Sequence, residues 1–411
     1  EAESFARAAA EVLASHGLEV VLSDRYMPTP ALCWSIAQDE KAVGGVMLTA
    51  SHNPARYLGF KIRMSDGGAS PVSFTDEVEA ALADEAPAER GSYQVADFMT
   101  PYLEALASMV DAQAIAEANL RVVVDSLYGA GQNYLADTMR DLGVDVREIH
   151  DQRNPCFGGL HPEPIPPHTD ALRDNVTAVD RDAGFVTDGD ADRIGAIDEH
   201  GNFVNPHRII CLVARHLAED KGLSGRIVKT LSTSVLVDRL GTALDLPVTT
   251  TPVGFKWIYE QMLHGDVLLG GEESGGIGFP PHVRERDGLL MALFLLEMMA
   301  QRKQTLGELV ESLFELTGPM EYLRYDMAID EDTKASFLAR ADTFAPDEVA
   351  GLTVQEIVRD DGLKFLLPDD AWLLLRPSGT EPLVRVYAEA SSAGVVDDLI
   401  AAGRAVVRGE V

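Results

Sequence analysis

A short apolar run leads into a polar, proline-ended segment in Gly44-Gly45-Val46-Met47-Leu48-Thr49-Ala50-Ser51-His52-Asn53-Pro54. The apolar run predicts a buried strand, and the residues after it predict a tight loop. Open α/β sheets bind ligands in loops at the carboxyl ends of their strands, so Ser51 is a candidate reactive serine. Ser, Asn and Pro are also ordinary turn residues, and this loop taken alone fits a structural turn as well.

Strand and helix patterns alternate along the rest of the chain. Apolar runs typical of strands lie at 43–48, 120–125, 183–186, 227–229 and 267–269, with helical spacing between them. Beyond residue 323 the pattern changes to three strands and two helices. We therefore expect an α/β protein with three related α/β domains of mixed sheets and flanking helices, at 1–113, 114–222 and 223–323, and a C-terminal α+β domain at 324–411.

The composition argues against nucleic acid and membranes as partners. The 411 residues include 34 Lys and Arg against 66 Asp and Glu, a formal net charge of −32 that repels phosphate backbones and anionic lipid. No apolar run approaches the ~20 residues of a membrane span. Scattered cysteines, Cys33, Cys156 and Cys211, predict free thiols in a reducing compartment, the cytoplasm. An anionic substrate would need a local basic site to overcome the acidic field.

A second loop, after another apolar strand, alternates carboxylates with small residues in Asp188-Gly189-Asp190-Ala191-Asp192-Arg193. Such carboxylates can converge on one hard cation, Mg²⁺ or Ca²⁺. An EF-hand begins in a similar way, but Arg193 stands where its glycine is needed and a strand precedes the loop. A solvated acidic turn is the other interpretation.

Two further loops carry groups suited to a phosphorylated sugar. In Gly270-Gly271-Glu272-Glu273-Ser274-Gly275-Gly276 the carboxylates and hydroxyl suit sugar hydroxyls, although a flexible acidic turn would look the same. In Arg376-Pro377-Ser378-Gly379-Thr380-Glu381-Pro382, followed by Arg385, the side chains and backbone N–H groups form an anion cradle or a structural turn. Isolated cations that could neutralise a phosphoryl group or move protons, or be structural, are Lys61, Arg193, Lys256 and Arg286.

These four loops, in this order, resemble those of the α-D-phosphohexomutase family, and the resemblance runs over nearly the whole chain. Phe60-Lys61, Gly254-Phe255-Lys256 and Arg286-Asp287-Gly288 are similar to further family motifs. The resemblance implies four domains around a central cleft, each giving one loop. The phosphoserine loop, or serine loop, is 49–54, the metal loop is 188–193, the sugar loop is 271–276 and the phosphate loop is 376–382. Two features depart from the family. Its N-terminal strand and Gly-Arg segment have no counterpart in this sequence, and Leu58 stands where Asn is usual.

The same resemblance implies the role of each site residue. Ser51 would carry the phosphoryl group, Lys61 would transfer protons and His52 would support the phosphoserine. Mg²⁺ would be held by the Ser51 phosphate and by Asp188, Asp190 and Asp192. Sugar and phosphate contacts would come from Arg193, Gly254, Lys256, Glu272, Ser274, Arg376, Ser378, Gly379, Thr380 and Arg385.

The implied activity is interconversion of glucose 1-phosphate and glucose 6-phosphate through a phosphoserine enzyme and a glucose 1,6-bisphosphate intermediate. The Glu-Glu-Ser-Gly-Gly of the sugar loop resembles phosphoglucomutases more than the Glu-Met-Ser of dual phosphomannomutases or the Glu-Gln-Ser of phosphoglucosamine mutases. A dual phosphomannomutase/phosphoglucomutase stays open as an alternative, as does a non-catalytic phosphosugar- or Ca²⁺-binding protein. We expect a small phosphosugar as the partner and a monomer or homodimer.

Overall fold

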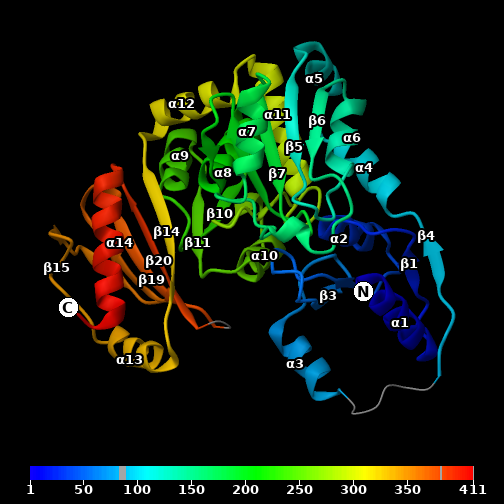
Figure 1. Cartoon of the computed structure of the whole chain (residues 1–411), viewed down its shortest axis with the longest axis horizontal. Coiled ribbons are helices and arrows are strands. Elements are labelled where there is room, and N and C mark those ends of the chain that lie inside the picture. Colours follow the sequence, from blue (N-terminus) through cyan, green and yellow to red (C-terminus); the bar gives the residue numbers. More distant parts are fainter. Residues whose placement is uncertain (83–88, 380–381, 411) are drawn as a thin grey trace.

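The computed structural model describes residues 1–82, 89–379 and 382–410. Four units follow one another along the chain, and Figure 1 shows the last of them, in orange and red, standing to one side of the other three. The expected architecture, three α/β units and a C-terminal α+β unit, is confirmed. In the described ranges, no helix combines the length and the apolar character that crossing a membrane requires.

The first unit presents the serine loop on a β-hairpin. Strand β2 (Gly44–Leu48) pairs antiparallel with β3 (Phe60–Met64), which places Met47 opposite Lys61. A separate ladder pairs β1 (Val21–Ser23) parallel to β4 (Gln94–Ala96), and no described strand joins the two ladders into one sheet. The helices are α1 (Ala2–Ser15), α2 (Thr29–Gln38), α3 (Val72–Ala80) and α4 (Met99–Ser108).

The second unit is a mixed sheet in the order β6-β5-β7-β8-β9. Strands β7 and β8 are buried throughout and pair antiparallel, and the loop between them carries the three aspartates. The strands are β5 (Arg121–Asp125), β6 (Asp145–Ile149), β7 (Ala183–Thr187), β8 (Ile194–Asp198) and β9 (Phe203–Val204). The helices are α5 (Ala112–Ala118), α6 (Tyr134–Asp141), η1 (Phe157–Gly159) and α7 (Asp170–Ala178).

The third unit is a mixed sheet in the order β11-β10-β12-β13, and the sugar loop connects β12 to β13. Its strands are β10 (Arg226–Thr230), β11 (Val248–Thr251), β12 (Val267–Gly271) and β13 (Ile277–Gly278). Helices α8 (Pro206–Arg215) and η2 (His216–Asp220) lead into this sheet, and its other helices are α9 (Leu236–Leu244), α10 (Phe255–Leu263), α11 (Gly288–Arg302) and α12 (Leu306–Thr317).

Helix α11 lies at the centre of a core that the first three units share. Its residues from Gly288 to Ala300 are all buried, as expected for a helix that is apolar on every side. Asp287 caps it by accepting a hydrogen bond from the Leu290 N–H at 3.0 Å. The continuous apolar cluster around it extends from Met27 to Met320, so the serine, metal and sugar loops stand on one packed body.

The last unit has its own core and a five-stranded antiparallel sheet in the order β14-β20-β19-β18-β17. Figure 1 shows α14 on the outer face of this sheet and the third unit beside its inner face. The strands are β14 (Glu321–Ala328), β15 (Glu348–Val349), β16 (Leu352–Thr353), β17 (Glu356–Val358), β18 (Leu363–Leu366), β19 (Trp372–Pro377) and β20 (Leu383–Ala390). The helices are α13 (Glu331–Ala341), η3 (Pro368–Asp370) and α14 (Ala393–Arg408).

A buried carboxylate joins the last unit to the third. Glu389 of β20 is 1% exposed, and its Oε2 accepts hydrogen bonds from the Val235 N–H at 2.9 Å and from Trp372 Nε1 at 2.6 Å. The Ser234 hydroxyl donates to the other carboxylate oxygen. Because a buried carboxylate is costly without such partners, this contact favours one docked position of the last unit.

Lys364 lies in the same interface, and Lys364→Met should change how stability depends on pH. The Lys364 Nζ donates to the Leu231 carbonyl at 2.7 Å and lies 4.0 Å from the Trp372 ring centroid. Burial, and then the nearby Lys229, lowers the pKa of Lys364 to about 7 from its ordinary 10.5. The pKa of Lys364 is lower in the folded protein than in the unfolded chain. Protonation of this lysine therefore lowers the free energy of unfolding by about 1.4 kcal/mol for each pH unit between 10.5 and about 7. Below about pH 7 the loss stays constant.

The Met variant should therefore gain most over the wild type near about pH 7, and the gain should shrink toward about pH 9. Urea unfolding across this range measures the difference. Lys41→Met, at an exposed lysine, is the matched control and should give a difference that does not vary with pH. If the stability difference between Lys364→Met and the wild type also did not vary with pH, the lowered pKa of Lys364 would be contradicted.

Candidate active site

Ser51 lies on a loop whose base continues the β2–β3 ladder. The Thr49 and Gly59 backbones exchange two hydrogen bonds of 3.1 Å. Ser51 has a φ of +53°, in the left-handed region that residues other than glycine seldom adopt, and its N–H donates to Thr49 Oγ1 at 2.8 Å. This conformation places Ser51 Oγ 3.1 Å from Asp188 Oδ2. Strained backbone of this kind concentrates at functional sites.

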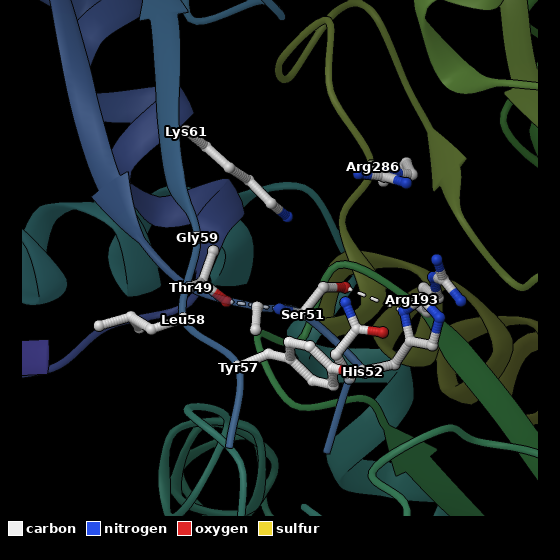
Figure 2. A pocket seen from close by; sticks show the side chains of 11 residues that line it. Thr49, Ser51, His52, Tyr57, Leu58, Gly59, Lys61, Arg193 and Arg286 are labelled. Atoms are coloured by element: carbon white, nitrogen blue, oxygen red, sulfur yellow. Dashed lines mark hydrogen bonds between the residues drawn. The ribbon is translucent and has the colours of Figure 1, made fainter. Parts of the chain in front are cut away.

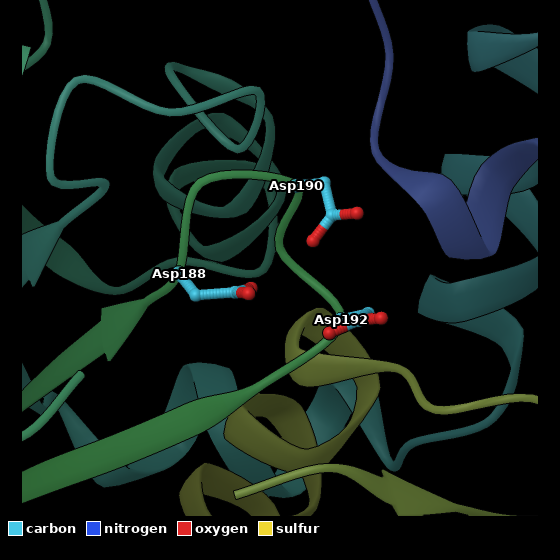
Figure 3. A group of neighbouring side chains, drawn as sticks. All are labelled: Asp188, Asp190 and Asp192. Atoms are coloured by element: carbon cyan, nitrogen blue, oxygen red, sulfur yellow. The ribbon is translucent and has the colours of Figure 1, made fainter. Parts of the chain in front are cut away.

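The metal loop brings its three carboxylates together. One oxygen each from Asp188, Asp190 and Asp192 lies within 4.8 Å of the others, and Figure 3 shows the three side chains pointing into the same space. Ala191 between them has a φ of +58°, which turns the chain sharply. A Cβ at Gly189 would lie 2.3 Å from the Ser51 carbonyl oxygen, so glycine lets the serine and metal loops touch.

The donor set fits a hard divalent cation. Asp188, Asp190 and Asp192 are at most 2% exposed, and Asp190 Oδ1 and Asp192 Oδ1 accept no hydrogen bond from the described residues. Burial, and then the two neighbouring carboxylates, raises the pKa of Asp188 well above its usual range. Buried, mutually repelling carboxylates with free oxygens are what Mg²⁺ or Ca²⁺ would satisfy. The strands β7 and β8 on either side exclude an EF-hand, which needs helices.

Three cations surround the serine. Figure 2 shows Lys61, Arg193 and Arg286 around Ser51, and all four line a cavity of about 410 Å³. Each cation also contacts an aspartate of the metal loop. The Lys61 Nζ lies 3.4 Å from Asp190, Arg286 Nη2 lies 2.6 Å from Asp192, and Arg193 Nε lies 3.9 Å from Asp188. Three positive side chains therefore lie around Ser51, each beside a carboxylate of the metal loop.

The sugar loop is joined to the metal loop. The Ile194 N–H donates to the Gly275 carbonyl at 3.0 Å, and Arg193 and Gly276 form an antiparallel bridge. Arg286 Nη1 lies 3.6 Å from the buried Glu272. A Cβ at Gly276 would lie 2.2 Å from Arg286 Cδ, so this glycine leaves the space through which the arginine reaches both loops.

His52 lies beside Ser51 as a neutral group. Its Nδ1 lies 3.5 Å from Ser51 Oγ. Burial, and then the Arg193 charge, lowers the pKa of His52 to about 2, so the imidazole is uncharged at neutral pH. The His161 ring packs edge-on at 6.0 Å between centroids, a neighbour that sequence reasoning missed because His161 lies in an irregular connection.

The other predicted site residues lie outside the described cavity. Arg376 opens the phosphate loop, where the Ser378 N–H donates to the Leu383 carbonyl at 3.0 Å. Arg385 Nε lies 3.9 Å from Asp326 on the same sheet. The remaining positions are Gly254 (φ +127°) at the start of α10, Lys256 over the Trp257 ring, half-buried Ser274, and Gly379; Thr380 lies outside the described residues.

A buried ion pair, which sequence reasoning missed, lies next to Arg286. Arg63, on β3 beside Lys61, pairs with Glu285, and Glu285 Oε1 accepts from Arg286 Nε at 3.1 Å. Arg63 and Glu285 side chains are 4% and 2% exposed. Burial opposes ionisation, yet Arg63 and Arg286 hold the pKa of Glu285 below its usual range. The pair thus links the hairpin of the first unit to the loop that carries Arg286.

Glu285→Ala should lower the free energy of unfolding by about 3–5 kcal/mol, because it leaves the Arg63 guanidinium buried and unpaired. Denaturant unfolding measures the loss. Glu3→Ala removes an exposed partner of Arg7, 3.0 Å away, and should cost no more than about 1 kcal/mol. A Glu285 variant as stable as the Glu3 variant would show that the pair does not hold the two units together.

The comparisons with known proteins decide the family. Four models describing phosphoglucomutase/phosphomannomutase match in order: α/β/α domain I at 1–89, domain II at 100–201, domain III at 205–317 and the C-terminal domain at 334–405. A phosphoglucomutase/phosphomannomutase of Thermococcus kodakarensis is 32% identical over 375 residues, 89% of this chain and 78% of that protein. The chain belongs to the phosphoglucomutase/phosphomannomutase family. The expected membership of the α-D-phosphohexomutase superfamily is thereby confirmed.

The phosphohexomutases are isomerase-type enzymes. The relatives of this chain are named for different sugars. A phosphoglucosamine mutase of Parafrankia is 34% identical over 386 residues, 92% of this chain and 77% of that protein. A crystal structure from Thermus thermophilus, named as a phosphomannomutase, matches with a TM-score of 0.88 and 39% identity over 99% of this chain and 88% of that one. Family membership therefore leaves the sugar undetermined.

Proposed function

We propose that this phosphohexomutase interconverts glucose 1-phosphate and glucose 6-phosphate, with Ser51 as the phosphoryl carrier. One observation carries the proposal: Ser51 Oγ lies 3.1 Å from Asp188 of the three-carboxylate site, in a cavity that Lys61, Arg193 and Arg286 also line. A serine hydroxyl is a weak nucleophile unless it is activated. A cation at the three-carboxylate site and the three positive side chains would stabilise negative charge on Ser51 Oγ and so activate it.

The reaction would proceed in two phosphoryl transfers. Phosphorylated Ser51 gives its phosphoryl group to the 6-hydroxyl of glucose 1-phosphate, so the Oγ–P bond breaks and an O6–P bond forms. The sugar hydroxyl loses a proton and Ser51 Oγ regains one, a relay that we assign to Lys61. Glucose 1,6-bisphosphate then turns around, its O1–P bond breaks and the Oγ–P bond forms again, while the Ser51 Oγ proton passes to O1, which leaves glucose 6-phosphate and phosphorylated Ser51. Added bisphosphate would act as an activator, because it phosphorylates Ser51.

Mg²⁺ is the proposed metal. Bound by Asp188, Asp190, Asp192 and an oxygen of the Ser51 phosphate, it would offset the negative charge on the transferring phosphoryl group. The uncharged His52 beside Ser51 Oγ would support the phosphoserine without adding a second charge there.

The substrate must be held in two opposite orientations, which requires separate sites for its hydroxyls and for its distal phosphate. Glu272 and Ser274 are proposed for the hydroxyls. Arg376, Ser378, Gly379, Thr380 and Arg385 are proposed for the distal phosphate, and Arg193, Gly254 and Lys256 for further contacts with the substrate. The last domain, with its separate core, would close over the ligand and exclude water. The four domains are proposed at 1–113, 114–222, 223–323 and 324–411.

Glucose is proposed as the sugar because the Glu272-Glu273-Ser274 segment resembles phosphoglucomutase loops. The names of the Thermococcus and Thermus relatives favour a dual glucose/mannose enzyme as the alternative. A coupled assay with Mg²⁺ and glucose 1,6-bisphosphate should give a kcat/KM for glucose 1-phosphate at least about 10-fold above that for mannose 1-phosphate, the lower end of what one changed substrate contact contributes. Equal or faster turnover of mannose 1-phosphate would establish the dual enzyme instead.

The cellular setting is also a proposal. Cys33, Cys156 and Cys211 are unpaired, which suits a reducing cytoplasm. A small phosphosugar is the proposed partner, with a monomer or homodimer as the assembly, and neither nucleic acid nor membrane is expected to bind so acidic a protein.

A further inference from the structure

One aspartate of the last unit touches two segments that are proposed to bind the substrate. Asp361 lies in the turn between β17 and β18. Its Oδ2 accepts a hydrogen bond from Arg376 Nε at 2.9 Å and another from the Val253 N–H at 2.8 Å. Arg376 opens the phosphate loop, and Val253 immediately precedes Gly254 and Lys256 in the third unit.

The backbone around Asp361 is shaped for this contact. Gly362 has a φ of +103°, and a Cβ there would lie 2.6 Å from the Leu375 carbonyl and 3.2 Å from Arg376 Cα. Only glycine therefore allows the turn to press against the end of β19. Leu363 pairs directly with Leu375, so the position of the Asp361 carboxylate beside Arg376 follows from the register of β18 and β19.

The contact uses one edge of the guanidinium. Asp361 binds Nε, and no described residue pairs with the two terminal nitrogens of Arg376. A guanidinium held by one edge cannot swing freely, while its terminal N–H groups stay available for a phosphate. The Arg376 side chain is 19% exposed, so a ligand can reach it.

The second hydrogen bond crosses between two separately packed bodies. Val253 belongs to the body that carries the serine, metal and sugar loops, whereas Asp361 and Arg376 belong to the last unit, which has its own core. At the other end of β19, Glu389 and Trp372 dock the same sheet face on Ser234 and Val235. Asp361 contacts both Val253 and Arg376, the first residue of the phosphate loop, so it couples the docking of the unit to the orientation of Arg376.

We propose that Asp361 is a positioning residue: one carboxylate oxygen aims the Arg376 guanidinium at the distal phosphate and docks the last unit on the segment that precedes Lys256. The inference rests on the proposed function, because it names the phosphosugar as the ligand of Arg376. Orienting the arginine before binding reduces the ordering cost of binding. Asp361 would therefore favour binding even though its negative charge lies close to the phosphate.

A double-mutant cycle tests this role. Glucose 6-phosphate binding is titrated calorimetrically with the wild type, Asp361→Asn, Arg376→Gln and the double variant, and KM and kcat are measured for each. Asp361→Asn should weaken binding and raise KM about 10-fold with a much smaller change in kcat, because a distal contact acts alike on ground and transition states. In the Arg376→Gln background the same substitution should add almost nothing, since it acts through that arginine.

Asp360→Asn is the matched control, because Asp360 is the exposed neighbour and its substitution makes the same change of charge; it should bind like the wild type. Asp361→Ser goes through the same cycle as a second variant, with thermal unfolding showing that each protein is folded. Additive losses in the cycle, an equal loss in Asp360→Asn, or tighter binding by Asp361→Asn would each overturn the positioning role. A wild type that binds glucose 6-phosphate without converting it would instead contradict the proposed function, and the binding cycle would still decide on Asp361.

Discussion

Ser51→Ala should lower phosphohexose turnover by about 10⁴-fold or more, the scale on which removing a nucleophile acts in other enzymes. The Oγ lost in this variant is the atom that lies 3.1 Å from Asp188, and no other described serine, threonine or cysteine hydroxyl or thiol lines the cavity except Thr49. Thr49 Oγ1 is occupied, because it accepts from the Ser51 N–H and donates to Asp190. The assay is glucose 6-phosphate formation coupled to its oxidation.

Ser73→Ala is the control for this variant. Ser73 is exposed on α3 in the same unit, and its loss should leave turnover and stability unchanged. Ser51→Ala should also remain folded, because the small side chain is only partly buried and the Ser51 N–H bond to Thr49 is kept. Retention of more than about a tenth of the wild-type rate would show that the phosphoryl group travels by another route.

The second large effect is expected at the metal loop, where Asp188→Asn should affect activity and stability in opposite directions. Losing one ligand should lower Mg²⁺-dependent turnover by about 10³-fold, since a bound cation supplies several kcal/mol of charge stabilisation. In the metal-free protein, however, Asp188 is buried beside two other carboxylates that repel it. An amide removes that repulsion, so the metal-free variant should unfold at the same temperature as the wild type or higher.

Thermal unfolding with and without Mg²⁺ measures the stability change, and the coupled assay measures the loss of rate. Mg²⁺ should raise the unfolding temperature of the wild type, because only the folded state gathers the three carboxylates, and the variant should lose most of that rise. Asp245→Asn, at an exposed aspartate, should change neither quantity. A Mg²⁺-induced rise that survives in Asp188→Asn would place the ion elsewhere.

The sequence alone predicts the core of the site because local chemistry positions it. Two small residues, Gly189 and Ala191, between alternating aspartates favour a sharp turn, and the structure turns at Ala191 with a φ of +58°. The strand expected at 43–48 appears as β2, and the serine loop follows it. The four loops, in their order along the chain, resemble one family, and that resemblance indicates roles that short motifs do not specify by themselves.

Other features depend on long-range pairing, which sequence reasoning could not find. Arg63 and Glu285 are far apart in the chain, and neither stands in a pattern that predicts burial, yet they form a buried ion pair. Strand β3 is a different kind of miss, because Phe60–Met64 does alternate apolar and charged residues after Gly59, the pattern typical of a half-buried strand. Asp361 likewise resembles any surface acid until β18 and β19 place it beside Arg376.

The most direct test of the account is to locate the phosphoryl group during turnover. The protein is incubated with Mg²⁺ and glucose 1,6-bisphosphate, the free bisphosphate is removed, and the protein is digested and mapped by mass spectrometry. A second sample is exposed to excess glucose 1-phosphate after the bisphosphate is removed and before digestion. We expect one phosphorylated site, at Ser51, whose occupancy falls in the second sample as glucose 1,6-bisphosphate appears. Continued turnover with Ser51 unmodified, or a phosphoryl group found at another residue, would contradict it.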